Sequence, residues 1–146
     1  MKRILAVALC ATAFAAAAGP FDQVKGKMKP GLYDYKMTME MPGMPAGMGG
    51  RPFTFQHCVT QKDIDEGAAL KGKDPNQKDC EVKDFKMSGN TASYTMECKQ
   101  NQMKGDVKMT FVENGFASDM KMSMNQGGQV MNMSQKMEGK RVGDCK

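Results

Sequence analysis

The chain has 146 residues, with 21 basic and 16 acidic side chains, 17 methionines and no tryptophan. Its charges are nearly balanced and interspersed, which excludes the strongly basic surface of a nucleic-acid-binding protein. The length suits a single domain with a substantial hydrophobic core.

The N-terminal segment has the pattern of a secretory signal peptide. Two basic residues precede an alanine-rich apolar stretch, and small residues lead to an A-x-A cleavage pattern at residues 16–18. The apolar stretch is too short to span a membrane. Cys10 follows Leu9, where a lipoprotein peptidase requires a small residue, so we expect Cys10 to be removed with the signal. We therefore predict export to the periplasm by residues 1–18 and one mature domain over residues 19–146.

The mature chain alternates polar and apolar residues in about seven short stretches. Such alternation with a period of two predicts antiparallel strands with one buried face. Asn114-Gly115 is a strong signal for a two-residue hairpin, and Gly127-Gly128 marks another turn. Residues 42–52 are rich in proline and glycine, which predicts an irregular connection. The predicted strands are residues 32–41, 53–57, 80–87, 91–98, 106–111, 116–124 and 131–137.

One short helix is expected after the second strand. The segment Thr60-Gln61-Lys62-Asp63 resembles a capping box, in which the first and last side chains bond to each other's backbone N–H groups. The helix is predicted to continue to about Leu70. The fold class predicted from these elements is all-β, an antiparallel meander with this single helix.

Four cysteines remain after the signal peptide, and an even number in an exported chain predicts two disulfides. If residues 88–90 form a three-residue loop, Met87 faces Thr91, and counting outward places Cys80 opposite Cys98. We favour this pair, together with a second bridge between the other two cysteines. A pairing of Cys58 with Cys80 stays open. The C-x-x-C spacing of a zinc site is absent from the sequence. The favoured bridges are Cys80–Cys98 and Cys58–Cys145.

Several motifs resemble a bacterial envelope family catalogued as domain of unknown function 3617. They are KPGLY at 29–33, MTMEMPGMP at 37–45, CVT with a following Asp at 58–63, SGNTAS and MEC within 88–98, and GKRVGDC at 139–145. The resemblance covers nearly all of residues 28–145, with Tyr33 where members often carry Trp. It implies an exported, disulfide-bearing β domain and brings no established activity.

The two ends of the domain also resemble those of lipocalin-like barrels. Such barrels begin with G-x-W and end with an arginine that packs across the aromatic ring. Gly31 and Tyr33 stand at the first end, and Arg141 stands at the other. Arg141 shares strand parity with Met137, so we expect it to face inward and stack over Tyr33. This resemblance implies a lipocalin-like barrel or a strongly curved half-barrel, with a two-sheet sandwich or an open curved sheet as alternatives.

The interior of such a fold would be lined mainly by methionine and aromatic side chains. Methionine is flexible and polarizable, and surfaces rich in it adapt to varied apolar ligands. The functional interpretation is therefore a cavity for a small hydrophobic ligand, or a role with an envelope partner. The simpler interpretation, which the composition favours, is a solid core in which methionine replaces leucine and valine. The residues expected to line the cavity are Tyr33, Tyr35, Met37, Phe55, Met96, Met109, Phe111, Met122 and Arg141.

A soft-metal site is the second hypothesis. Thioether sulfur suits Cu(I), and Met41, Met44 and Met48 form an M-x-x-M-x-x-x-M pattern in the glycine-proline connection. His57, the single histidine, belongs to the following strand. These four residues predict a Cu(I) or Ag(I) site for copper buffering or tolerance. Sacrificial oxidation of the same methionines is an alternative.

Catalysis has little support in the sequence. His57 has no partner motif such as a nucleophile elbow or H-E-x-x-H. The carboxylates of Asp34, Glu40, Asp106 and Asp119 fall on the outward parity of their strands. We therefore predict a protein that is not an enzyme and that needs no cofactor, unless Cu(I) binds. The mature chain has no further apolar run long enough for a membrane span.

Overall fold

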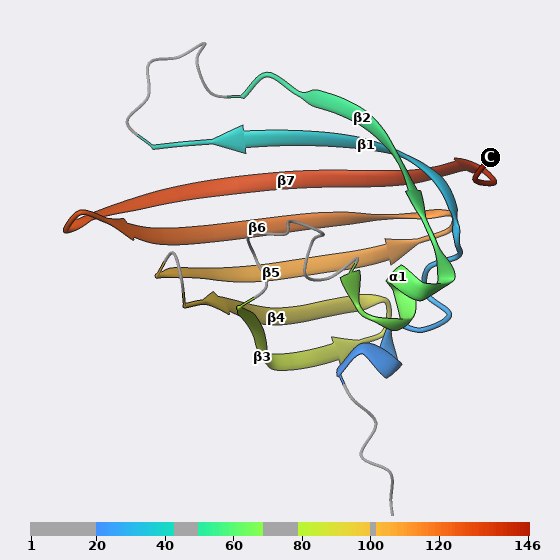
Figure 1. Ribbon diagram of the computed structural model, residues 1–146, viewed down its shortest axis with the longest axis horizontal. Helices are drawn as coiled ribbons and strands as arrows, with labels where there is room; N and C mark the ends of the chain where they lie inside the picture. Colours follow the sequence, from blue (N-terminus) through green and yellow to red (C-terminus); the bar gives the residue numbers. More distant parts are fainter. Residues whose placement is uncertain (1–19, 43–49, 69–78, 100–101) are drawn as a thin grey trace, which may run out of the picture.

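The computed structural model describes residues 20–42, 50–68, 79–99 and 102–146. Seven antiparallel strands form one sheet in the order β2-β1-β7-β6-β5-β4-β3 (Figure 1). The predicted all-β fold with seven antiparallel strands is confirmed. The strands are β1 Gly31–Glu40, β2 Phe53–Val59, β3 Cys80–Ser88, β4 Thr91–Cys98, β5 Met103–Val112, β6 Gly115–Gln126 and β7 Gln129–Gly143. Two short helices accompany them, the 3₁₀ helix η1 Pro20–Gln23 and the α-helix α1 Gln61–Asp65.

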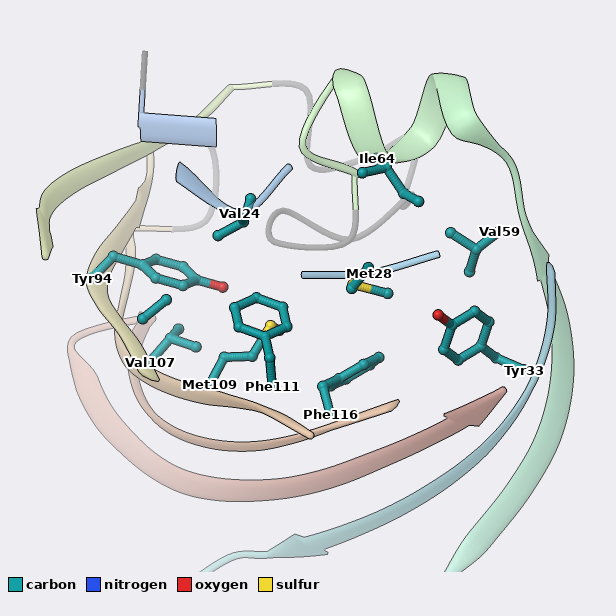
Figure 2. Close-up of a cluster of buried hydrophobic side chains, with 11 residues drawn as sticks. Val24, Met28, Tyr33, Val59, Ile64, Tyr94, Val107, Met109, Phe111 and Phe116 are labelled. Atoms are coloured by element: carbon teal, nitrogen blue, oxygen red, sulfur yellow. The ribbon is translucent and has the colours of Figure 1, made fainter. Parts of the chain in front are cut away.

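The sheet would be a closed meander if β2 paired with β3, but these two strands form its opposite edges. Every two strands that follow each other in the sequence are hydrogen-bonded neighbours, except β2 and β3, and β1 also pairs with β7. After Val59 the chain leaves the sheet and forms α1, which lies over the curved face instead of turning directly into β3 (Figure 2). For this reason the described strands form an open, curved sheet, and the closed barrel is not the arrangement found.

The short helix begins with the predicted capping box. The Thr60 hydroxyl accepts a hydrogen bond from the Asp63 N–H at 3.2 Å, and the Asp63 carboxylate accepts one from the Thr60 N–H at 2.9 Å. Both groups satisfy donors that a helix N-terminus leaves open. The helix ends at Asp65 with Glu66 as its C-cap, so it is shorter than predicted, and Leu70 lies outside the described residues.

The hydrophobic core lies between the concave face of the sheet and two covering segments. Figure 2 shows the strands curving around the cluster, with α1 and the N-terminal segment on the opposite side. The segments contribute few apolar side chains, among them Ile64 from α1. The buried cluster comprises Val24, Met28, Tyr33, Val59, Ile64, Ala92, Tyr94, Val107, Met109, Phe111 and Phe116.

The β3–β4 hairpin differs from the predicted register near its turn. Ser88 pairs with Thr91, so the loop is shorter than expected, and Met87 pairs with Ala92. The prediction that Met87 faces Thr91 is therefore wrong. A β-bulge at Asp84, whose φ is 52°, then adds one residue to β3 and restores the expected pairing at the far end of the hairpin.

Both favoured disulfides are present. Cys58–Cys145 has a Cα–Cα distance of 5.6 Å, and Cys80–Cys98 has one of 4.0 Å. The first bridge joins β2 to the segment that follows β7. The second joins the first residue of β3 to the last residue of β4, at the open end of the hairpin. Within the described ranges, no helix is long and apolar enough to cross a membrane.

Candidate functional site

Strand register places every methionine of the seven strands on the same face of the sheet. Met122 lies opposite Met133 and Met37 lies opposite Met137, and each pair shares the face that carries the core. Alternate residues of a strand point to opposite faces, so the charged residues between these methionines point outward. The methionines on this concave face are Met37, Met39, Met87, Met96, Met103, Met109, Met120, Met122, Met124, Met131, Met133 and Met137.

One half of this face, which we call the covered half, is a packed core of aromatic side chains. Tyr33 and Met109 are each 1% exposed, and Phe116 is 3% exposed. Burial raises the pKa of Tyr35, at the border of this half, to about 12, and it also raises the pKa of Tyr94. Water is therefore largely excluded from the space beneath α1 and the N-terminal segment.

The other half lies toward the β6–β7 hairpin, away from α1 (Figure 1). Here Met39 is 43% exposed, Met131 is 39% exposed and Phe53 is 63% exposed. The remaining methionines of this region are partly buried, so an extended apolar surface reaches solvent. We call it the methionine half, defined by Met37, Met39, Met103, Met120, Met122, Met124, Met131, Met133 and Met137.

In the methionine half, the charged side chains of the described strands lie on the opposite face. Within the described strands, no acidic or basic side chain occupies a concave position of the methionine half. On the convex face, Lys99 contacts Glu81 at 2.9 Å and Lys104 contacts Glu97 at 3.5 Å. A hydrogen bond from Lys83 holds the pKa of the Glu97 carboxyl below its usual value. One sheet therefore presents one apolar and one charged surface.

The residues predicted to line a cavity all lie on the concave face, but they differ in burial. Tyr33, Met109 and Phe111 are buried in the main core, and Met96 is buried in a second cluster with Cys80 and Cys98. The other five, Tyr35, Met37, Phe55, Met122 and Arg141, are partly exposed. The ring of Tyr35 stacks on that of Phe55 with centroids 4.9 Å apart.

The hollows lined by described residues do not coincide with the predicted cavity. One of about 670 Å³ is lined mainly by outward-facing residues, including Asp34, Lys36, Glu138 and Lys140. A second, of about 200 Å³, lies beside Tyr33 and the β5–β6 hairpin. The charged lining of the first hollow distinguishes it from the apolar interior that the sequence led us to expect.

Arg141 lies directly opposite Tyr33 on neighbouring strands, as the barrel resemblance implies. Its guanidinium is held by two contacts: Nε donates to the Pro30 carbonyl at 2.8 Å, and a terminal nitrogen contacts the Asp144 carboxylate. A Cβ atom at Gly31 would come within 2.4 Å of Arg141 Nε, so the glycine leaves the room that this contact needs.

Two of the four predicted metal ligands, Met41 and His57, lie at different places along the sheet. Met41 follows β1 directly, whereas His57 pairs with Tyr33, eight residues back along that strand. At about 3.3 Å per residue the two positions are about 26 Å apart. Met44 and Met48 lie outside the described residues. Among the residues that the structure describes, no cluster of three or more His, Cys, Asp or Glu suits a metal ion.

Three methionines outside the predicted site lie abreast on adjacent strands. Met103 of β5 pairs with Met124 of β6, which pairs in turn with Met131 of β7. Counting outward from the Gly127-Gly128 turn would have aligned Met124 with Met131. Counting from a loop at Asn114-Gly115 would have set Met124 opposite Gly105, whereas Val112 pairs with Gly115 and Met124 pairs with Met103. The place of Met103 was hidden because Gly105 interrupts the apolar alternation between Met103 and Val107.

These features define a class of small, disulfide-bonded antiparallel β domain with one charged and one methionine-lined face. Residues 28–145 match the family described as "Protein of unknown function (DUF3617)", and the chain belongs to that family. The resemblance indicated by the sequence motifs is thereby confirmed. No curated protein and no solved structure matches the chain. The family description assigns no activity, so a function has to be argued from the concave face.

Proposed function

We propose that this protein is an exported, non-enzymatic binding protein of the periplasm that holds one apolar chain, such as a lipid acyl chain, on the methionine half. The observation that carries the proposal is the position of this surface. It is mainly apolar, with Gln135 as an uncharged polar side chain among the methionines, it is partly exposed, and it belongs to the concave side of the sheet. A large apolar patch rimmed by polar residues is typical of a binding surface.

The length of the methionine half suits a single acyl chain. Met131 and Met137 lie six residues apart on β7, which corresponds to about 20 Å of strand. One acyl chain extends about 15 Å in a bilayer, half of the hydrocarbon thickness of about 30 Å. An extended chain of this length fits along the strands within the patch.

The chemistry of the patch supports an apolar ligand. Methionine side chains have three rotatable bonds and a polarizable sulfur, so they can adapt to a flexible chain without a preformed cavity. A charged ligand would find no oppositely charged partner on the concave positions of the described strands in this half. The same positions also offer no general base or nucleophile, which supports a binding role.

The test is calorimetric titration of saturated fatty acids into protein purified from the periplasm with its disulfides formed. Each added CH₂ group should tighten binding by up to about fourfold until the patch is filled. Met39→Gln with Met131→Gln should weaken binding, because amides replace two exposed thioethers. Val130→Gln is the matched control, since Val130 is 65% exposed on the opposite face of β7.

Two results would count against the proposal. Equal weakening by the control variant would place the ligand elsewhere, and an affinity that does not depend on chain length would exclude an acyl chain as the ligand. The mass of the purified protein tests export in the same experiment, since cleavage after Ala18 is expected.

A further inference from the structure

The geometry points to a second binding capacity of the methionine half, a thioether site for one Cu(I) or Ag(I) ion formed by Met103, Met124 and Met131. These residues are direct neighbours across β5, β6 and β7. Their side chains leave the same face of the sheet, and neighbouring strands are about 4.8 Å apart. The three methionine side chains therefore begin at backbone positions that form one straight row across the strands.

The row is close enough for the sulfur atoms to meet at a single ion. Directly opposed residues of antiparallel strands have Cβ atoms about 4.5–5.5 Å apart. Each methionine has three rotatable bonds, so the outer two side chains can incline toward the central one without backbone movement. The central position belongs to Met124, which pairs with both others.

A fourth sulfur lies beside this row. Met122 stands two residues from Met124 on the same face of β6, opposite Gly105 of β5. A Cβ atom at Gly105 would lie 3.2 Å from Met122 Cγ, so the Met122 side chain covers the space that the glycine leaves. Met122 therefore inclines toward β5, the strand that carries Met103.

The donor set selects a soft monovalent ion. Thioethers favour Cu(I), whereas Zn²⁺, Mg²⁺ and Ca²⁺ require nitrogen, thiolate or oxygen ligands. The nearby Cys80 and Cys98 are joined in a disulfide, so they supply no thiolate to this end of the sheet. No carboxylate or amine of the described strands points into the methionine half.

Solvent access and residue choice also fit such a site. Met131 is 39% exposed and its two neighbours are partly exposed, whereas Met109 on the covered half is 1% exposed. For an apolar lining alone, β-branched and aromatic residues fit a strand better than methionine does. The sulfur atom is what methionine adds at these positions.

The first experiment is an Ag(I) titration of the intact, disulfide-bonded protein, followed by an anaerobic Cu(I) titration against a competing chelator. We expect one ion per chain. The triple variant Met103→Leu, Met124→Leu and Met131→Leu should lose this binding. Leucine conserves volume and apolarity and removes only the sulfur. The matched control, Met87→Leu with Met109→Leu, changes methionines of the covered half and should bind as the wild type does.

A third variant, Met41→Leu with Met44→Leu and Met48→Leu, tests the connection between β1 and β2 as the source of the ligands. Loss of binding in this variant, with retention in the strand triple variant, would overturn the assignment. Failure of the wild-type protein to compete for either ion would also overturn it.

A measurement on the wild type avoids any dependence on how the variants fold. In protein labelled at the methionine methyl carbons, Ag(I) should shift the NMR signals of Met103, Met124 and Met131 and leave Met87 and Met109 unchanged. Shifts confined to other methionines would contradict the site.

Titrations of the wild-type protein separate this inference from the proposed lipid binding. A fatty-acid titration tests the lipid proposal and an Ag(I) titration tests the metal site, and neither needs a variant. Ag(I) binding that the strand triple variant loses would support the metal site whether or not fatty acids bind. Fatty-acid binding without any Ag(I) binding would overturn the metal site and leave the lipid proposal standing.

Discussion

The two halves of the concave face are built on the same strands but differ in composition and in cover. In the covered half, Tyr33 and Phe116 pack beneath α1 and are at most 3% exposed. In the methionine half, Met39 and Met131 remain about 40% exposed. The apolar face of the sheet thus extends beyond the segments that cover it. Rigid aromatic rings fill the part that is closed, and flexible thioethers line the part that meets solvent.

The difference shows that a chain rich in methionine need not place most of its methionines in the packed core. Packed interiors have a density close to that of organic crystals, and side chains with defined rotamers suit them. A surface that receives a partner benefits from adaptable side chains instead. Three measurements of stability test this difference between the halves.

Removal of the disulfides should have the largest effects. Cys58–Cys145 closes a loop of 87 residues near the covered half, and Cys80–Cys98 closes one of 18 residues near the methionine half. Chain-entropy estimates give losses of about 4.6 and about 3.2 kcal/mol on opening these loops. Urea unfolding of the two double Cys→Ala variants measures both. A larger loss for Cys80–Cys98 would show that the methionine half carries more of the stability than its exposure indicates.

Truncation of one methionine in each half gives a matched comparison of packing. Met109→Ala should reduce the free energy of unfolding by about 2–5 kcal/mol, because it leaves a cavity in the covered half. Met131→Ala should cost less than about 1 kcal/mol, because the side chain is already 39% exposed. Urea midpoints report both values. Equal losses would mean that the methionine half is packed as tightly as the core.

Alkaline pH should weaken the covered half with a smaller effect. Burial raises the pKa of Tyr35 to about 12 and also raises those of Tyr33 and Tyr94. An unfolded tyrosine has a pKa of about 10, so the folded protein holds these protons more tightly. Stability should therefore be unaffected by these groups below about pH 10 and should fall as the pH rises toward 12.

Urea midpoints over this range test the prediction, with Tyr35→Phe as the control that should reduce the fall. An absorbance titration in which all three tyrosines ionise near the normal value would show instead that water reaches the covered half.

Local alternation in the sequence was sufficient to predict the strands and their inward faces. Residues such as Val107, Met109 and Phe111 lie on the concave side because they alternate with polar residues, and alternate residues of a strand point to the same face. The Cys80–Cys98 disulfide followed from counting along a hairpin, and Cys58–Cys145 joins the two cysteines that remained. That count succeeded although the turn was misread, because the bulge at Asp84 compensated for the shorter loop.

What the sequence could not reveal depends on contacts between distant segments. The same alternation underlies both halves, so no local pattern separates the buried Met109 from the exposed Met131. That difference depends on where α1 and the N-terminal segment lie. Two of the four predicted metal ligands, Met41 and His57, lie far apart for a similar reason, because residues close in sequence can lie at different levels of an antiparallel pair.

The strand order has a consequence for the growing chain. β1 is synthesised first, but one of its two neighbours in the sheet is β7, and the Arg141 contact to Pro30 spans 111 residues. The hairpins from β3 to β7 are local and can form in succession, whereas the β1–β2 pair has no further strand of the sheet to join until β7 exists. Because Cys145 follows β7, the bridge that fixes β2 can close only after this late docking step. The first two strands of the domain are therefore among the last to join the complete sheet.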